Sequence, residues 1–437
     1  MGNVELWLIL LGKAMLSLLT QPFFYVSLIL VGLIYAFIIR MERSMFSTKL
    51  RPWIKPFIHS VAGGILAAIF VTLLCALLGF TLTVPTVWWL WGVSLVMSLM
   101  GLRFINIAYS ASIVCLLHLI ATAVGPLQLE QSTLSSIYQS LLDIEPLSLL
   151  VIAALLLLTQ ALLIAWQGKH MVSPIYMSGK RGKIIGGYGL QGYWAIPLLL
   201  FMPVAVGTHG AVSFAASTVQ PYFLVAGPEA WLLLACPIML GVTGMTQSDS
   251  PKQLVRQTAQ QWGLYAVILL LISLVSWWIE PMLWVAAIGM LFSFELLRWL
   301  NFHNESKQPP AYAPLDQGLR VLAIVEGSPA VHMEIQVGDT VLEANGQAVN
   351  SLAELYEAMS INPAFCRLKL LNHSGEVKFA QRTRYADEHH QLGIIMAPDG
   401  NAKHLKHYRE PTLITIFGKG KLRRNLTSEN DSMNITL

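Results

Sequence analysis

The sequence predicts a polytopic α-helical membrane protein, with about nine or ten membrane segments, that continues into a small α+β domain. Of its 437 residues, 55% are hydrophobic and only 12% are charged, against about 25% charged in an ordinary soluble domain. The apolar residues gather in long uncharged runs over residues 1–300, and such runs are long enough to cross a bilayer. From Leu315 to Pro398 the apolar runs are short and charges are interspersed, which indicates a water-soluble domain.

Nine predicted membrane segments share an apolar core and end at charged, glycine or proline residues. They cover residues 22–39, 57–80, 88–102, 104–124, 147–166, 193–218, 222–242, 261–279 and 282–300. The stretch from Val4 to Thr20 is ambiguous, because Lys13, Ser17 and Thr20 fall on one helical face. It predicts either an amphipathic helix at the interface or a tenth span. It has no basic leader or small-residue cleavage site, so we expect no cleavable signal peptide.

Basic residues are confined to alternate loops. The basic loops follow residues 39, 166 and 242 and carry Arg40, Arg43, Lys49, Arg51, Lys55, Lys169, Lys180, Arg181, Lys183, Lys252 and Arg256. The loop at 125–145 has Glu130, Asp143 and Glu145 but no lysine or arginine. Under the positive-inside rule the basic loops are cytoplasmic. We therefore expect a multi-pass protein of the cell membrane whose C-terminal domain lies in the cytoplasm.

The sequence carries no recognisable signature of catalysis or metal binding. Zinc proteolysis needs two histidines on one helical turn beside a glutamate, and His59, His118 and His209 have no such neighbours. There is no GxSxG motif or second soluble domain to hold a serine protease, and the four cysteines stand singly. The sequence therefore predicts a protein that is not an enzyme, with no metal site, no cofactor and no nucleic-acid partner.

Ionisable groups inside the predicted spans are few. His118 stands alone in mid-segment, where a hydrogen-bonded helix contact and a functional group are both open interpretations. Glu295 and Arg298 are spaced i, i+3, which predicts an ion pair. A transporter usually brings several such groups together in related halves, and no internal repeat is visible. The glycine-rich stretch 179–189 lacks the ending of a P-loop, so we expect a basic loop near anionic headgroups.

The C-terminal part divides into a linker at 301–314, a domain at 315–398 and a tail at 399–437. The domain begins with a predicted strand at 319–325, followed by a short helix with Ser328 as its N-cap and Pro329 in its first turn. Further strands are expected at 340–344, 366–371, 376–379 and 392–397, with a hairpin turn at Asn345-Gly346 and a helix at 351–360 capped by Ser351.

This order resembles a PDZ domain, and the motifs Gly327-Ser-Pro-Ala330 and Val337-Gly-Asp-Thr-Val-Leu-Glu-Ala-Asn-Gly346 carry the resemblance. PDZ domains add a peptide to a sheet edge beside a helix, and amides of a short loop hold its carboxylate. The best match to that loop is Gln391-Leu-Gly-Ile-Ile395, as in circularly permuted bacterial PDZ domains; Gln317-Gly-Leu319 is the alternative. The resemblance implies a peptide-binding site made of Leu392, Gly393, Ile394, Ile395, Met396, Leu352, Leu355 and Met359. Leu352 and Leu355 fit the domain core equally well.

Many spans, no catalytic signature and one C-terminal permuted PDZ domain together resemble the MinJ family of cell-division topology proteins. That resemblance implies a membrane scaffold that bridges DivIVA-like and MinD-like proteins and so restricts septum placement, with enrichment at septa and poles. Two alternatives remain open. One is a regulatory or substrate-presenting subunit of a membrane protease, and the other is a transporter with an accessory PDZ domain.

The C-terminal tail is basic and is expected to be disordered near anionic lipid. Its basic residues are Lys403, Lys406, Arg409, Lys419, Lys421, Arg423 and Arg424. The sequence ends with Ile435-Thr-Leu437, a hydrophobic C-terminus of the kind that PDZ grooves accept. Self-association by head-to-tail docking is therefore a hypothesis, which deletion of these three residues would test.

Overall fold

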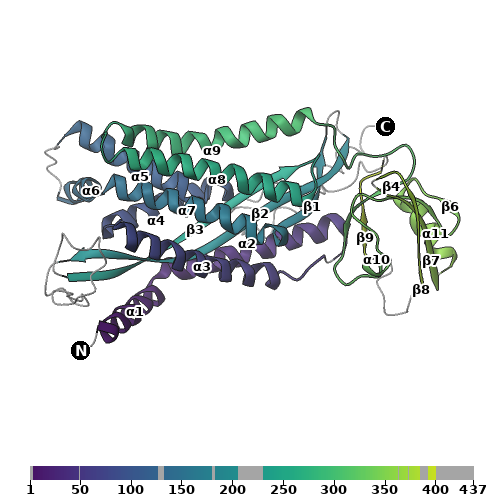
Figure 1. The fold of residues 1–437 in the computed structure, drawn as a ribbon, viewed down its shortest axis with the longest axis horizontal. Coiled ribbons are helices and arrows are strands. Elements are labelled where there is room, and N and C mark those ends of the chain that lie inside the picture. The colour runs from purple at the N-terminus through teal and green to yellow at the C-terminus, as the bar shows by residue number, and fades with distance from the viewer. Residues whose placement is uncertain are drawn as a thin grey trace, which may run out of the picture.

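A computed structural model shows an elongated helical domain with a smaller β-rich domain at one end (Figure 1). It describes residues 3–48, 50–125, 132–179, 183–204, 230–362, 364–372, 374–383 and 392–399. The tail beyond Asp399 lies outside the described residues. So do Glu130, Lys49, Lys180, Arg181 and His209.

Most of the first 307 residues are helical. The helices are α1 (Asn3–Thr20), α2 (Pro22–Phe46), α3 (Ile54–Leu78), α4 (Val84–Met100), α5 (Ile107–Val124), α6 (Ser132–Leu142), α7 (Pro146–Gln167), α8 (Pro251–Val275) and α9 (Met282–Lys307). Among the described residues, six helices (α2, α3, α5, α7, α8 and α9) are long and apolar enough to cross a membrane, and α4 is a shorter apolar helix. The prediction of a polytopic helical membrane region is confirmed.

Two of the predicted spans are strands rather than helices. The structure has three antiparallel strands in this region, β1 (Val172–Ser178), β2 (Ile184–Val204) and β3 (Ala230–Thr246), in the order β1-β2-β3. β2 and β3 form a long hairpin with Pro197 directly opposite Pro237. A proline inside a helix breaks the hydrogen-bond ladder, whereas a strand tolerates one where its nitrogen points out of the sheet. The helical assignment was therefore wrong for 193–204 and 230–242, and the rest of these two predicted spans lies outside the described residues.

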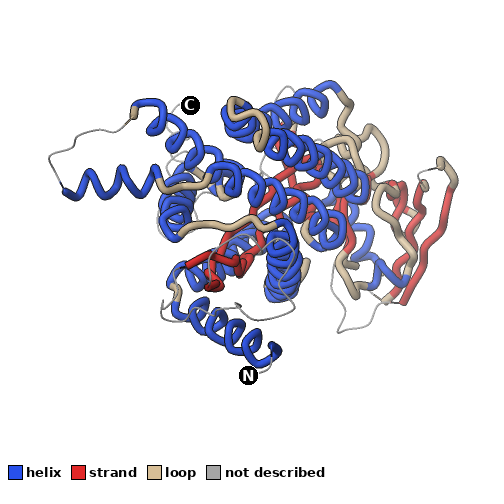
Figure 2. Tube along the Cα trace, turned by 60° about the vertical axis from the view of Figure 1, so that its left-hand side comes forward, coloured by secondary structure: helices blue, strands red, loops and turns tan. Residues whose placement is uncertain are grey.

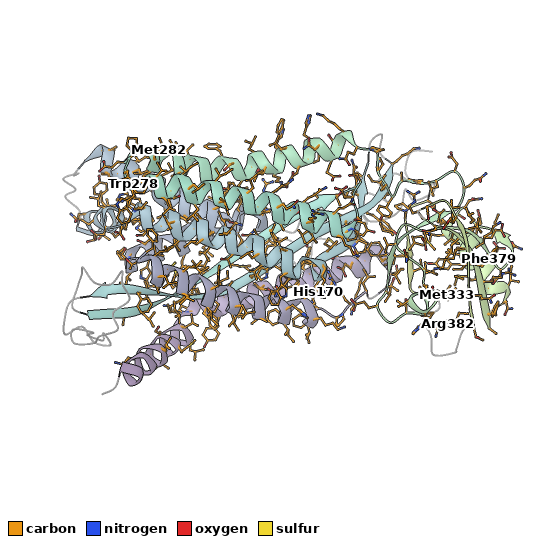
Figure 3. All side chains as sticks on the ribbon, viewed as in Figure 1. His170, Trp278, Met282, Met333, Phe379 and Arg382 are labelled. Atoms are coloured by element: carbon orange, nitrogen blue, oxygen red, sulfur yellow. The ribbon has the colours of Figure 1, made fainter. Side chains whose placement is uncertain are left out.

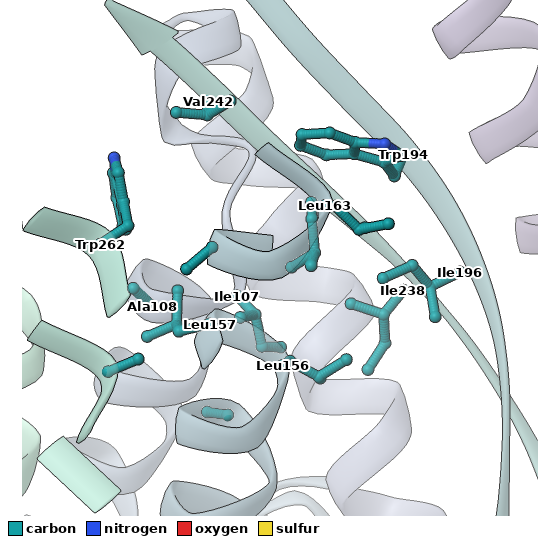
Figure 4. Close-up of a cluster of buried hydrophobic side chains, with 14 of the residues drawn as sticks. Ile107, Ala108, Leu156, Leu157, Leu163, Trp194, Ile196, Ile238, Val242 and Trp262 are labelled. Carbon is teal, nitrogen blue, oxygen red and sulfur yellow. The ribbon is translucent and has the colours of Figure 1, made fainter. Parts of the chain in front are cut away.

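The hairpin runs lengthwise between the helices (Figures 1 and 2). Trp194 and Ile196 of β2 and Ile238 of β3 lie in one buried hydrophobic cluster with Leu156 and Leu163 of α7 (Figure 4). Trp194 and Ile196 are fully buried. The paired part from residue 193 to 204 spans roughly 40 Å at about 3.3 Å per residue, which exceeds the hydrocarbon core of about 30 Å. The hairpin thus extends over the same depth as the surrounding helices.

The outer edge of β2 bonds to side chains of α3. The hydroxyl of Ser60 donates to the carbonyl of Tyr193, and the amide of Leu199 donates to the Thr72 hydroxyl at 3.3 Å. The two β2 residues, Tyr193 and Leu199, are an even number of positions apart, as expected for backbone groups that both point away from β3. Polar side chains from a neighbouring helix therefore replace the missing strand at this edge.

The outer edge of β3 is closed in the same way. The side-chain nitrogen Nδ2 of Asn106, at the start of α5, donates to the carbonyl of Gly241 at 2.8 Å. The indole nitrogen of Trp91 in α4 donates to the carbonyl of Pro237 at 3.0 Å. Unsatisfied backbone groups at membrane depth cost several kcal/mol each, so these bonds allow a hairpin to be enclosed by membrane helices.

The C-terminal domain has the predicted α+β pattern. Its elements are β4 (Leu319–Ile324), α10 (Pro329–His332), β5 (Thr340–Ala344), β6 (Gln347–Ala348), α11 (Leu352–Ile361), β7 (Phe365–Leu371), β8 (Val377–Thr383) and β9 (Ile394–Met396). The sheet order is β8-β7-β5-β4-β9, and β6 pairs with β5. Local signals operate as predicted: the Ser351 hydroxyl accepts from the amide of Glu354, and Asn345 and Gly346 both have positive φ.

The predicted linker is partly helical and closely packed. Helix α9 continues to Lys307, where the Glu305 carboxylate accepts hydrogen bonds from the Thr246 hydroxyl at 2.7 Å and the Gln247 amide at 3.0 Å. Tyr312 is buried, and its carbonyl accepts from the amide of Gly186 at 2.9 Å. The segment at 301–314 therefore contacts β2 and the end of β3 through these hydrogen bonds.

At the end of the membrane domain remote from the C-terminal domain, the structure differs from the prediction in one respect. The acidic loop at 125–145 contains the helix α6, and His118 Nδ1 lies 2.9 Å from the carbonyl of Leu141 in it. This is the helix contact that was one interpretation of His118. Trp278 and Met282 lie at this end, whereas His170 lies beside the C-terminal domain (Figure 3).

Candidate peptide-binding edge

Strand β9 forms one edge of the C-terminal sheet, and α11 lies beside it. β9 pairs only with β4 among the described strands. The amide of Leu352, the first residue of α11, donates to the carboxylate of Asp399 just beyond β9 at 3.1 Å. The start of α11 therefore lies at the C-terminal end of β9. An edge strand beside a helix is the arrangement in which PDZ domains add a ligand strand.

Two residues before β9 have left-handed backbone conformations. Leu392 has φ 54° and Gly393 has φ 73°. A Cβ atom at Gly393 would lie 2.2 Å from Cβ of Ser328, the N-cap of α10. Both the positive φ and the close approach require glycine at this position. The loop is thus held tightly against the start of α10.

The orientation of this loop makes it suitable for a carboxylate. The carbonyls of Leu392 and Gly393 accept hydrogen bonds from the amides of Ala330 at 3.0 Å and Val325 at 2.8 Å. In a trans peptide the next N–H points away from the carbonyl. The amides of Gly393 and Ile394 therefore point away from α10 and β4, toward the open side of β9. Successive amides that follow left-handed residues form a concave site for an anion.

The alternative loop at Gln317-Gly-Leu319 does not have this geometry. The amide of Gly318 donates to the Asn350 side chain at 3.0 Å. A Cβ at Gly318 would lie 2.8 Å from the carbonyl of Val341, so the loop packs on β5. The structure therefore favours the loop at Leu392-Gly393.

The residues implied by the PDZ resemblance divide into three groups. Leu355, Met359, Leu392 and Met396 are buried in the core of the C-terminal domain, and Leu352 and Ile394 pack at the margin of that core. Ile395 instead belongs to the buried cluster of the membrane domain. Its side chain is therefore not part of the groove, although it was included in the predicted site.

Hydrogen bonds also hold the start of α11, at one end of the groove. The carboxylate of Glu354 accepts from the amide of Asn350 at 2.8 Å, and this bond, with further bonds from Ser351, lowers the pKa of Glu354. A negative charge in the first turn stabilises a helix. Among the described residues, no three His, Cys, Asp or Glu side chains are placed to hold a metal ion.

Sequence reasoning missed the part of the membrane domain that reaches this edge. Tyr176 of β1 is buried, and its hydroxyl donates to the carbonyl of Met396 at 3.0 Å. Tyr188 of β2 donates in the same way to the carbonyl of Leu322 in β4 at 2.6 Å. No local motif marks either tyrosine, because each contact joins residues more than 130 positions apart in the sequence.

Together the fold and the edge define a polytopic membrane protein with a C-terminal PDZ domain. The PDZ domain family matches residues 300–364. The edge strand β9 comes last among the strands that the structure describes.

Comparison with curated proteins supports the resemblance to MinJ. The cell division topological determinant MinJ of Bacillus subtilis (strain 168) is 28% identical over 250 residues, which cover 57% of this chain and 61% of that protein. The probable MinJ proteins of Lacticaseibacillus paracasei and Lacticaseibacillus casei (strain BD-II) are 29% identical over 283 residues, which cover 64% of this chain and 74% of theirs. The chain is thus similar to proteins named MinJ cell division topological determinants, and it spans about three fifths of the length of the Bacillus relative.

Proposed function

We propose that the protein is a non-catalytic membrane scaffold whose PDZ domain binds the C-terminal peptide of a cell-division protein. The observation that carries this proposal is the loop at Leu392-Gly393. Its carbonyls are bound on the inner side, so the amides of Gly393 and Ile394 face the open edge of β9. A free carboxylate fits those amides, and the ligand strand would continue along β9.

The side walls of the groove suit a short apolar peptide end. Leu352 and Ile394 are partly exposed at the margin of the domain core. Leu355 and Met359 are buried behind them and form the floor against which the last ligand side chain packs. Exclusion of charge from this floor favours a hydrophobic terminal residue, because burial of an unpaired charge is costly.

The distribution of charge supports a cytoplasmic position for the PDZ domain. Arg51 and Lys55 lie next to the PDZ domain: Lys55 Nζ is 3.6 Å from the Glu326 carboxylate, and Arg51 donates to β1. Asp143 and Glu145 lie between α6 and α7, at the opposite end of the molecule (Figure 1). Under the positive-inside rule the PDZ side is the cytoplasmic side, where division proteins are accessible.

The partners that we propose are DivIVA-like and MinD-like proteins, as the MinJ resemblance implies. A scaffold that holds both at the membrane would restrict the position of the septum. The protein would then concentrate at septa and poles rather than spread evenly over the membrane.

The substitution Leu352→Glu tests the groove. It places a charge in the apolar wall of the groove, at the end remote from the carboxylate loop, where burial of an unpaired charge beside the ligand strand is costly, while an acidic residue in the first turn of α11 favours the helix. Full-length protein in lipid nanodiscs would be titrated with the purified DivIVA-like and MinD-like proteins of the same organism. We expect at least one of these two proteins to bind about tenfold more weakly to the variant than to the wild type. Removal of the last three residues of that partner protein should weaken its binding to the wild type by the same factor.

Ala353→Glu is the matched control, because Ala353 is an exposed neighbour in the same helical turn. It adds the same charge outside the groove and should leave binding unchanged. Equal binding by the wild type and both variants would contradict recruitment through this groove.

A further inference from the structure

The ligand edge of the PDZ domain lies directly against the membrane domain. Tyr176 of β1 donates to the carbonyl of Met396, and its ring packs edge-on against Phe46 of α2. Ile395 and Ala397 are buried in the hydrophobic cluster of the membrane domain. The side chains of Ile395 and Ala397 on β9 thus pack on the membrane domain, and Tyr176 of β1 reaches the backbone of the same strand.

The strand that carries Tyr176 is firmly held. Ser173 of β1 donates to the buried carboxylate of Glu42 at 2.5 Å, and Arg51 donates to Ser173 at 2.7 Å. Arg51 also forms an ion pair with Glu42 at 3.3 Å. The position of the Tyr176 hydroxyl is therefore set by packing and by a network of charged hydrogen bonds.

The Met396 carbonyl belongs to the open edge of β9. Gly393 and Ala397 bond to β4, through the bonds Val325 N to Gly393 O and Ala397 N to Arg320 O. Because main-chain groups alternate in direction along a strand, the groups of Ile394 and Met396 point the other way, toward the ligand. The Met396 carbonyl is thus an acceptor that a ligand strand would need, and Tyr176 already occupies it.

Tyr176 also marks the end of the groove that is remote from the carboxylate loop. Burial raises the pKa of the Tyr176 hydroxyl, and the neighbouring Tyr356 and Asp399 raise it further. The hydroxyl therefore remains protonated and can donate at neutral pH. Tyr356 lies on α11, and Asp399 caps that helix, so three side chains converge where β9 ends.

We infer that the membrane domain limits the length of peptide that the PDZ domain holds, with Tyr176 as the specificity-determining residue. This inference rests on the proposed peptide-binding function. In an antiparallel pair, backbone groups that point to the partner recur at every second residue of each strand. If the last ligand residue bonds to Ile394 of β9, the third ligand residue from the end therefore lies opposite Met396. The last two residues pair freely, whereas pairing through the third residue and beyond requires displacement of the Tyr176 hydroxyl.

Selection from a library of octapeptides with free carboxyl termini tests the inference. The full-length chain in nanodiscs would be compared with Tyr176→Phe, which removes the hydroxyl and keeps the ring. We expect the wild type to select residues only at the last two positions. We expect the variant to select at the third position and beyond, and to bind its selected octapeptides about fivefold more tightly, the size expected for one hydrogen bond.

Tyr188→Phe is the matched control, because it removes the other tyrosine bond between the domains, to Leu322 in β4, and leaves Met396 untouched. It should select as the wild type does. Identical selection by the wild type and Tyr176→Phe would overturn the inference and leave the proposed function standing. An equal change in both variants would also overturn it, because the cause would then be loosened docking. If no peptide is selected by any of the three proteins, the proposed peptide binding fails, and the inference with it.

Discussion

The described residues form two antiparallel sheets whose edges differ: side chains close the edges of one sheet, whereas one edge of the other is open. The β2–β3 hairpin is surrounded by membrane helices, and side chains such as Ser60 and Asn106 bond to its outward backbone groups. The PDZ sheet ends at β9, and within the described part of the chain the Tyr176 hydroxyl donates to the outer edge of this strand, at the Met396 carbonyl. An edge at membrane depth must be closed, because neither water nor a ligand can satisfy it. An edge outside the membrane can remain open and therefore can bind.

A residue that forces α3 away from the hairpin should destabilise the membrane domain strongly. In Gly64→Ala, the new Cβ would lie 2.1 Å from the carbonyl of Ala195 in β2. We expect a loss of about 3 kcal/mol in the free energy of unfolding, the upper range for overpacking, as measured by denaturant titration in mixed micelles. Gly92→Ala in α4 is the control, since no atom lies within 4 Å of its added Cβ. A similar result for both variants would mean that α3 does not need to touch the hairpin.

Removal of the Asn106 side chain, which bonds to the outer edge of β3, should have the next largest effect. Asn106→Ala removes the hydrogen bonds to Gly241 and to Gln160 and leaves the Ala108 amide without its N-cap acceptor, while the Gly241 carbonyl keeps only the 3.3 Å bond from Gln160. We expect a loss of about 2 kcal/mol, the cost of buried groups left without partners. Asn301→Ala removes an exposed bond to Gln261 instead and should cost less than about 0.5 kcal/mol. Equal small losses in the same titration would show that the hairpin edge tolerates being open.

The smallest effect is expected from the exposed ion pair that joins the PDZ domain to the membrane domain. The ion pair between Lys55 and Glu326 is exposed, with side chains 63% and 77% accessible. Exposed pairs contribute little, so Lys55→Ala should change the hydrogen exchange of the β4 and β9 amides by less than about 0.5 kcal/mol in opening free energy. Faster exchange on the scale of 2 kcal/mol would mean that this charge pair, rather than the buried tyrosines, holds the domains together.

Local signals allowed the PDZ domain to be predicted from the sequence. The cap at Ser351 and the turn at Asn345-Gly346 each act over a few residues, and the structure has both. The position of the loop at Gly393 followed from the same kind of pattern. These features need no knowledge of the rest of the chain.

The hairpin and the contact at Tyr176 could not be predicted in that way. An apolar run of 20 residues satisfies the length rule for a membrane helix, and hydropathy alone does not separate it from a buried strand. The available signal was Pro197, which pairs with Pro237, together with the glycines around it. Tyr176 and Met396 are 220 residues apart, so only the folded structure brings them together.

The localisation of the protein tests the central claim most directly, namely that the open edge of β9 recruits division proteins. A fluorescent fusion would be imaged in cells that carry the wild type, Leu352→Glu or Ala353→Glu. The account predicts enrichment at septa and poles for the wild type and Ala353→Glu, and uniform membrane staining with abnormal cell length for Leu352→Glu. Uniform staining of the wild type, with normal cell length after deletion, would contradict it.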